Sequence, residues 1–224
     1  DYAMIRDGDR ILLGVSGGKD SLSLLLVLRH LQSYAPVRFD LGVITVDPEV
    51  EGFDPSSLTA YYDELEVPWH YRSQPIMDEA RTRMQGDSFC AYCARMKRGI
   101  MYSTCREHGY NVLALAQHLD DLAESFLMSA FHQGRLETMK AHYRIDAGDL
   151  RVIRPFVYVR EAQTRDFALA AGLPVVPDSC PACFSAPTQR AYMKTLLARE
   201  EREHPHLFAN LLHAMRPLMG DRVG

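Results

Sequence analysis

The chain lacks the features that would place it in a membrane or on a secretory route. No uninterrupted apolar run approaches the roughly 20 residues that a helix needs to cross a bilayer, although 47% of its 224 residues are hydrophobic. The segment from Asp1 to Arg10 is charged and lacks the apolar stretch of a secretory signal. We therefore expect a cytoplasmic protein with no membrane partner.

An excess of positive charge is also missing. The sequence has 25 Lys and Arg against 29 Asp and Glu, a formal net charge of -4. Overall charge therefore does not attract nucleic acid, and any contact with RNA requires a local basic face. One candidate face is made up of Arg135, Lys140, His142, Arg144, Arg151 and Arg154. The alternative is an ordinary solvated surface.

Cysteine is scarce, but it is arranged in pairs. Of the five cysteines, four form the motifs Cys90-x-x-Cys93 and Cys180-x-x-Cys183, and we expect Cys105 to be a small buried side chain. Paired cysteines without secretory features more often hold a metal than form a disulfide. A structural zinc, a disulfide or redox pair, and an iron–sulfur cluster or sulfur-handling thiol pair all remain open, because spacing alone does not choose between iron and zinc.

Short apolar runs alternate with helical segments along most of the chain. This order predicts an α/β fold with a doubly wound parallel sheet of about five strands. We expect one domain over residues 1–184, carrying both cysteine pairs, and a helical C-terminal extension over residues 185–224. A polar loop is expected to lead to Cys90 and Cys93, and a helix is expected from Cys93 to His108, with its end at Gly109. The predicted strands are 11–15, 39–47, 67–71, 111–116 and one near 152–155.

A glycine-rich turn joins the first strand to a leucine-rich helix. Its sequence is Ser16-Gly17-Gly18-Lys19-Asp20-Ser21, which is neither a Walker A loop nor the dinucleotide fingerprint. Backbone N–H groups at such a turn form a cradle for an anion, and glycine lets the backbone approach it closely. The alternative is a turn without a ligand. The hexapeptide looks like the PP-loop of ATP-pyrophosphatases, which grip the pyrophosphate half of ATP.

Further motifs extend this likeness over nearly the whole chain. The chain resembles the tRNA 2-thiocytidine biosynthesis proteins and, more widely, the iron–sulfur-dependent tRNA thiolation enzymes. Beside the glycine turn, the matching stretches are Met4 to Ile11, Cys90 to Gly99, Asp120-Asp121, Ile153-Arg154-Pro155 and Pro177 to Cys180. The resemblance implies an adenine nucleotide alpha hydrolase-like PP-loop fold and an ATP-dependent tRNA sulfurtransferase.

The resemblance also implies cofactors and site residues. It implies ATP with Mg²⁺, and a [4Fe-4S] cluster held by Cys90, Cys93 and Cys180, with Cys183 not a ligand and the fourth iron open to sulfide. The implied ATP-binding residues are Gly14, Ser16, Gly17, Gly18, Lys19, Asp20, Ser21, Val46 and Ala116. The implied catalytic residues are Asp20, Lys97, Asp120 and Asp121. Taken alone, Lys97 could be an exposed helix cation, and the aspartate pair a helix N-terminal cap.

The implied reaction adenylates a carbonyl oxygen, C2 of cytosine in tRNA, and replaces it with sulfur. The implied partners are tRNA, a sulfur donor such as a cysteine desulfurase or free sulfide, and a second copy of the chain. In one departure, Ala116-Gln117 stands where the family usually carries Gly-His, which could alter the acceptor. The alternatives are thiolation of a small molecule, a PP-loop ligase or amidase with structural zinc, and a nucleotide-sensing or RNA-binding module without turnover.

Overall fold

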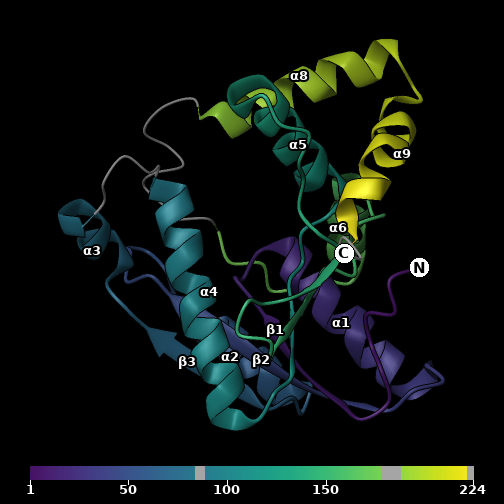
Figure 1. Cartoon of the computed structure of the whole chain (residues 1–224). Helices are drawn as coiled ribbons and strands as arrows, with labels where there is room; N and C mark the ends of the chain where they lie inside the picture. Colours follow the sequence, from purple (N-terminus) through teal and green to yellow (C-terminus); the bar gives the residue numbers. More distant parts are fainter. Residues whose placement is uncertain (84–88, 178–187, 221–224) are drawn as a thin grey trace.

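The computed structural model describes residues 1–83, 89–177 and 188–220. Its centre is a six-stranded sheet in the order β3-β2-β1-β4-β6-β5 (Figure 1). Five strands are parallel, which confirms the predicted sheet, and β5 adds an antiparallel edge that the sequence analysis missed. The strands are β1 Asp9–Gly14, β2 Phe39–Asp47, β3 Trp69–Ser73, β4 Val112–Ala114, β5 His142–Arg144 and β6 Arg151–Ile153.

Helices connect the strands and extend beyond the sheet. They are α1 Lys19–Tyr34, α2 Ser56–Glu64, α3 Ile76–Arg83, α4 Phe89–His108, α5 Leu119–Gln133, α6 Glu161–Ala170, α8 Gln189–Glu203 and α9 Leu207–Met219. The helices α4 and α5 end at Gly109 and Gly134, whose φ angles of 73° and 64° lie in the left-handed region. Glycine adopts this conformation without the strain that a Cβ brings, so both helices stop where their glycines stand.

Two apolar layers cover the sheet, one on each face. Because side chains alternate along a strand, Ile11 and Leu13 of β1 enter one core cluster while Leu12 enters the other. The first cluster joins the sheet to α1, α2 and α6, and the second joins it to α3 and α4. A parallel sheet buried on both faces is the expected result of strand–helix–strand connections.

The helices α8 and α9 pack on α5 and form an arm beyond the sheet (Figure 1). Leu197 of α8 and Phe208 and Met215 of α9 share a buried cluster with Leu122 of α5. The predicted boundary between residues 184 and 185 stays a prediction. None of the described helices is long and apolar enough to cross a membrane.

Two members of the predicted basic face are buried, so that prediction is wrong for them. Arg151 is 6% exposed and forms an ion pair with Asp9 of β1. Arg154 is 5% exposed and donates to the side-chain oxygen of Gln117 at 2.9 Å and to the backbone carbonyl of Lys140 at 2.6 Å. Arg151 begins β6 and Arg154 directly follows it, and the side chains of both are buried, which a linear count of basic residues does not reveal.

The Asp9–Arg151 pair ties together the start of β1 and the start of β6. Asp9 also accepts a bond from the side chain of Asn111 at 3.1 Å, so the carboxylate is fully engaged. We predict that Arg151→Met lowers the free energy of unfolding by about 3 kcal/mol, because it leaves a buried carboxylate without its cation. Urea unfolding measures this change.

The matched control for this prediction is Arg144→Met on the neighbouring strand. Arg144 is exposed and donates only to the carbonyl of Gly148 among the described contacts. The control is expected to change the free energy of unfolding by less than about 0.5 kcal/mol. Equal losses in the two variants would contradict a special role for the buried pair.

Candidate active site

The site forms where the strand order reverses. From β1 the chain adds β2 and β3 on one side, and later adds β4 and β6 on the other side. The carboxyl ends of β1 and β4 therefore lie next to each other, at the position where open α/β sheets bind their ligands. The glycine turn follows β1, and the segment from Ala116 to Asp121 follows β4.

Gly17 makes a turn that no other residue would make without strain. Its φ is 88°, and a Cβ there would lie 3.0 Å from the Cβ of Val176. The backbone N–H of Val176 donates to the carbonyl of Gly17 at 3.0 Å, so the segment after α6 crosses directly over the turn. A hydrogen bond within the turn joins its two ends: the backbone N–H of Ser16 donates to the hydroxyl of Ser21 at 3.2 Å.

A group of charged side chains surrounds the start of α1. The ammonium of Lys19 lies 2.9 Å from a carboxylate oxygen of Asp20 and 3.1 Å from one of Glu161. Burial opposes the charged form, but the two carboxylates raise the pKa of Lys19 above its usual value. Asp20 also accepts a hydrogen bond from the hydroxyl of Thr164 in α6. The first turn of α1 is therefore linked to α6 through side chains alone.

His118 lies at the centre of the predicted carboxylates. It is 4% exposed, and its Nε2 is 3.8 Å from Asp20 while its Nδ1 is 3.8 Å from Asp120. The Nδ1 atom accepts from the backbone N–H of Asp121, whose carboxylate accepts from the backbone N–H of His118 at 3.0 Å. Asp121 therefore completes a capping box for α5. Because Nδ1 accepts, the proton of a neutral ring lies on Nε2, which faces Asp20.

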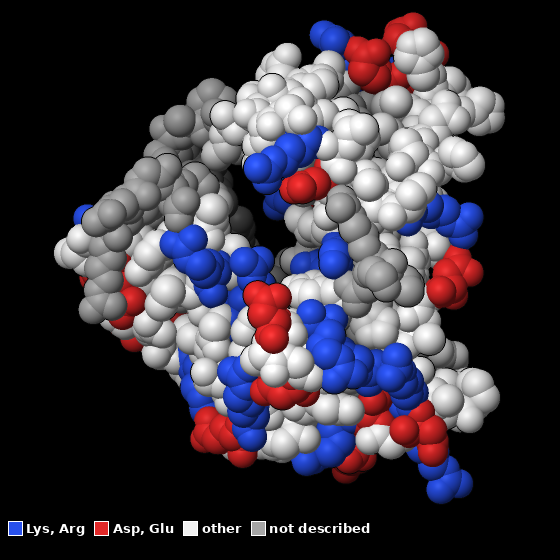
Figure 2. All heavy atoms as spheres, in the orientation of Figure 1, with Lys and Arg blue, Asp and Glu red and all other residues white. Residues whose placement is uncertain are grey.

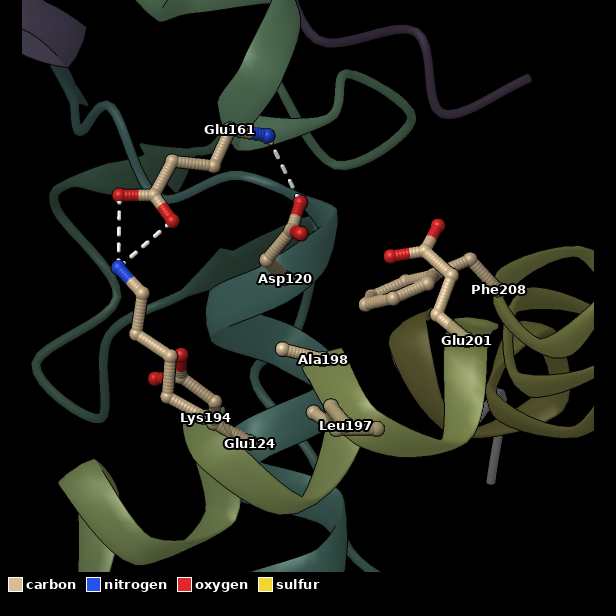
Figure 3. Close-up of a pocket in the computed structure, with 8 residues that line it drawn as sticks. All are labelled: Asp120, Glu124, Glu161, Lys194, Leu197, Ala198, Glu201 and Phe208. Atoms are coloured by element: carbon tan, nitrogen blue, oxygen red, sulfur yellow. Dashed lines mark hydrogen bonds and ion pairs between the residues drawn. The ribbon is translucent and has the colours of Figure 1, made fainter. Parts of the chain in front are cut away.

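Asp120 takes no part in the capping box, and its carboxylate binds the start of α6. Its carboxylate accepts from the guanidinium of Arg160 at 3.1 Å and from the backbone N–H of Glu161 at 2.8 Å. Arg160 also contacts Glu201 of α8 at 2.6 Å and lies over the ring of Phe208, 3.3 Å from its centre. Asp120, Glu201 and Phe208 line a cavity of about 90 Å³ between α5, α6, α8 and α9 (Figure 3).

Both cysteines of the first pair lie in a helix, so the predicted loop is wrong for Cys90, whereas the helix predicted from Cys93 to His108 is confirmed. The helix α4 begins at Phe89, and Cys90 and Cys93 both fall in its first turns. Three residues apart, they face one side of the helix, where Cys90 is exposed and Cys93 is partly buried. Cys180 and Cys183 lie outside the described residues. The described parts contain no group of three or more His, Cys, Asp or Glu side chains placed to hold a metal.

Cys105 behaves as predicted. It is fully buried in the cluster between the sheet and α4. Burial raises the pKa of its thiol to about 12, so the thiolate that binds metals does not form there. The cysteines of α4 thus divide into an inert thiol near the end of the helix and an accessible pair at its start.

Of the remaining predicted residues, Gly14, Val46 and Ala116 lie at the carboxyl ends of β1, β2 and β4, and Lys97 lies on α4. Val46 is buried at the end of β2, Ala116 is partly buried after β4, and Lys97 is partly exposed on α4. Gly14 ends β1 against the side chain of Met101, whose sulfur would lie 2.9 Å from an added Cβ. Figure 2 shows a hollow between α4 and the α5–α8 side of the molecule, with Lys and Arg side chains at its rim.

Several residues of this network were not predicted from the sequence. They are His118, Arg160, Glu161, Thr164 and Lys194. A signal for two of them was present: Arg160 and Glu161 closely follow the last parallel strand, whose carboxyl end lies at the same edge as the glycine turn. Nothing in the local sequence around Lys194 indicates that α8 comes back to this edge.

The buried carboxyl of Glu124 gives the site a measurable pH dependence. Burial raises its pKa from 4.5 to about 7, and the nearby Arg190, at 3.3 Å, lowers it only in part. The folded state thus binds the proton more tightly than the unfolded state, and stability present below pH 4.5 is lost as the pH rises through about 7. Glu124→Gln should remove this loss, worth up to about 3 kcal/mol.

Urea unfolding at about pH 5 and about pH 8 tests this expectation, on both sides of the perturbed pKa. Relative to the unmodified protein, Glu124→Gln should gain stability at the higher pH. The exposed Glu203→Gln on α8 is the control and should show no such gain. A difference between Glu124→Gln and the unmodified protein that is the same at both pH values would contradict the expectation.

Comparison with known proteins agrees with this arrangement. A family model described as a PP-loop domain matches residues 2–200. A tRNA-cytidine(32) 2-sulfurtransferase of Geobacter sulfurreducens is 42% identical over 216 residues, which are 96% of this chain and 84% of that protein. A protein of the same name from Polynucleobacter asymbioticus is 34% identical over 98% of this chain and 72% of its own length.

A solved structure shares the fold. It is U34-tRNA thiolase NcsA from Methanococcus maripaludis with its [4Fe-4S] cluster, which matches 100% of this chain and 76% of its own, with a TM-score of 0.79 and 19% identity. At that identity the likeness shows the fold alone. The family model and the two relatives confirm the resemblance seen in the sequence, and the chain belongs to the PP-loop family of tRNA-cytidine(32) 2-sulfurtransferases.

Proposed function

We propose that this protein is an ATP-dependent tRNA sulfurtransferase that converts a cytosine of tRNA to 2-thiocytosine. The names of its relatives indicate cytidine 32 as the target. The C2 oxygen attacks the α-phosphorus of ATP, and pyrophosphate leaves. Hydrosulfide then adds at C2, and AMP departs with the former oxygen, so that a thiocarbonyl replaces the carbonyl. An unpaired base in a loop exposes the edge that such chemistry needs.

The crossing of residues 174–177 over the glycine turn is the observation that carries this proposal. The hydrogen bond from Val176 to Gly17 places that segment on the predicted phosphate cradle. Cys180 follows four residues later in the sequence, and an extended chain of that length spans at most about 14 Å. ATP chemistry and the predicted third cysteine ligand are therefore tied together by a short length of chain.

The chain's own residues suit the binding of a triphosphate with Mg²⁺. The N–H groups at the start of α1 point toward the cradle, and the helix dipole favours an anion there. Asp20 and Asp120 supply carboxylate oxygens, the ligands that Mg²⁺ prefers. Lys97 would neutralise charge that develops on the adenylated intermediate. These roles are proposals that rest on placement at one edge of the sheet.

The cysteines of α4 fit a cluster site. Cys90 and Cys93 lie three residues apart on one side of a helix, with Cys90 open to solvent. Two thiolates in that arrangement, joined by Cys180, would hold a [4Fe-4S] cluster and leave one iron without a protein ligand. When bound, the cluster would supply a terminal position for sulfide. Cysteine desulfurase or free sulfide as donor, and a homodimer, stay predictions.

The cluster and the product can be tested in one experiment. Protein purified without oxygen is expected to contain about four iron and four acid-labile sulfide per chain. With ATP, Mg²⁺, sulfide and unmodified tRNA, it should form 2-thiocytidine, detected by mass spectrometry of tRNA digests. Cys90→Ala should lose both the iron and the product, because it removes an accessible thiolate from the first turn of α4.

Cys105→Ala is the matched control on the same helix. It removes an inert buried thiol and should leave iron content and product formation unchanged. One zinc per chain without labile sulfide, even after anaerobic reconstitution, would contradict the cluster and favour the ligase or amidase alternative. A full cluster with no thiolated tRNA, but with a thiolated small molecule, would instead contradict the acceptor.

Binding of ATP is tested at the glycine turn itself. Gly17→Ala is expected to weaken binding of α,β-methylene-ATP with Mg²⁺ at least about tenfold, because its Cβ strains the φ angle and meets Val176. Gly148→Ala is the control, since its φ of 78° is equally unfavourable but no atom lies within 4 Å of the added Cβ. Calorimetric titration measures both. Unchanged affinity in Gly17→Ala would place the triphosphate elsewhere.

A further inference from the structure

Glu161 lies between two lysines, and the proposed reaction gives this glutamate no role. Its Oε1 atom lies 3.1 Å from the ammonium of Lys19 in the glycine turn. The ammonium of Lys194 in α8 lies 2.8 Å from that same oxygen and 2.7 Å from the other (Figure 3). One carboxylate therefore joins the predicted ATP site to the C-terminal helical arm.

The charges of this group are balanced only when both lysines are counted. Lys19 lies between two carboxylates, those of Asp20 and Glu161. Glu161 in turn lies between two ammonium groups, and despite its burial Lys194 and Lys19 lower its pKa to about 2. Its side chain is 26% exposed, and that of Lys194 is 57% exposed. The carboxylate is thus ionised throughout the physiological range.

A triphosphate at the glycine turn changes this balance. Its phosphates and the carboxylate of Glu161 are both anions that pair with Lys19, so they compete for the same ammonium. A carboxylate left beside the triphosphate without its own cation would repel it. Lys194 supplies that cation, because it contacts both oxygens of Glu161 from α8.

We propose that Glu161 is a positioning residue of the ATP site, which holds Lys19 together with Lys194 when the site is empty and stays paired with Lys194 alone when a triphosphate takes Lys19. This inference rests on the ATP site of the proposed function. It makes Lys194, a residue of α8, a determinant of ATP affinity although it is not part of the glycine turn. A second link runs in parallel, from Asp120 through Arg160 to Glu201 of α8.

A double-mutant cycle on Glu161 and Lys194 tests the proposal. The affinity of α,β-methylene-ATP with Mg²⁺ is measured by calorimetric titration on protein purified without oxygen. Lys194→Met should weaken binding roughly three- to tenfold, the effect of one nearby charge that is partly screened by solvent. Glu161→Gln should bind at least as tightly as the unmodified protein, because the competing anion is gone.

The decisive measurement is the Kd of the double variant, in which Lys194→Met is added to Glu161→Gln. There the loss of the lysine should change Kd by less than about twofold, since no carboxylate is left to neutralise. As a single substitution, Lys194→Arg keeps the charge and should bind as tightly as the unmodified protein. Arg202→Met, which removes an exposed cation farther along α8, is the control and should leave Kd unchanged.

An equal effect of Lys194→Met with and without the Glu161→Gln substitution would overturn the proposal, and so would a loss no larger than that of Arg202→Met. These outcomes differ from failure of the proposed function. If the protein bound no nucleotide, every variant would give no heat of binding, whereas failure of this inference leaves nucleotide binding intact and removes only its coupling to Lys194. Thermal unfolding of each variant shows that a changed Kd is not a loss of fold.

Discussion

The missing Cβ at Gly17 is the constraint on which the site depends. It permits a left-handed turn directly after β1 and leaves room for Val176 to lie against the turn. A side chain at that position would push away the segment that leads toward Cys180. The shape of the glycine turn and the path of the chain over it are thus two results of one small residue at the switch point of the sheet.

Around that turn, charge is organised so that no buried ion lacks a partner among the described side chains. Lys19, Asp20, Glu161 and Lys194 form one chain of ion pairs. Asp120, Arg160 and Glu201 form another. Both chains end on α8, which makes the C-terminal arm part of the electrostatics of the site. Partly buried pairs of this kind position groups more than they stabilise the fold.

The sequence predicted the parts of the site that are local. The glycine turn, the Asp120-Asp121 pair at the start of α5 and the buried Cys105 each have a short-range signature, and the structure places them as expected. The helix predicted from Cys93 begins earlier, at Phe89, so the loop predicted for Cys90 was wrong, because polar residues around a helix start look like a loop. Arg151 and Arg154 were wrongly assigned to the surface, because the spacing of basic residues along the sequence does not show which side chains point into the protein.

The sequence by itself determined the parallel fold, the family and the position of the glycine turn, because periodicity and glycine chemistry act over a few residues. Only the tertiary structure decided that Glu161 reaches Lys19 of the glycine turn and that Lys194 reaches Glu161. Their approach depends on two long connections, from β6 into α6 and from α6 to α8. Contacts between residues more than thirty positions apart, such as Glu161 with Lys194, arise from packing of whole helices, and no local pattern encodes them.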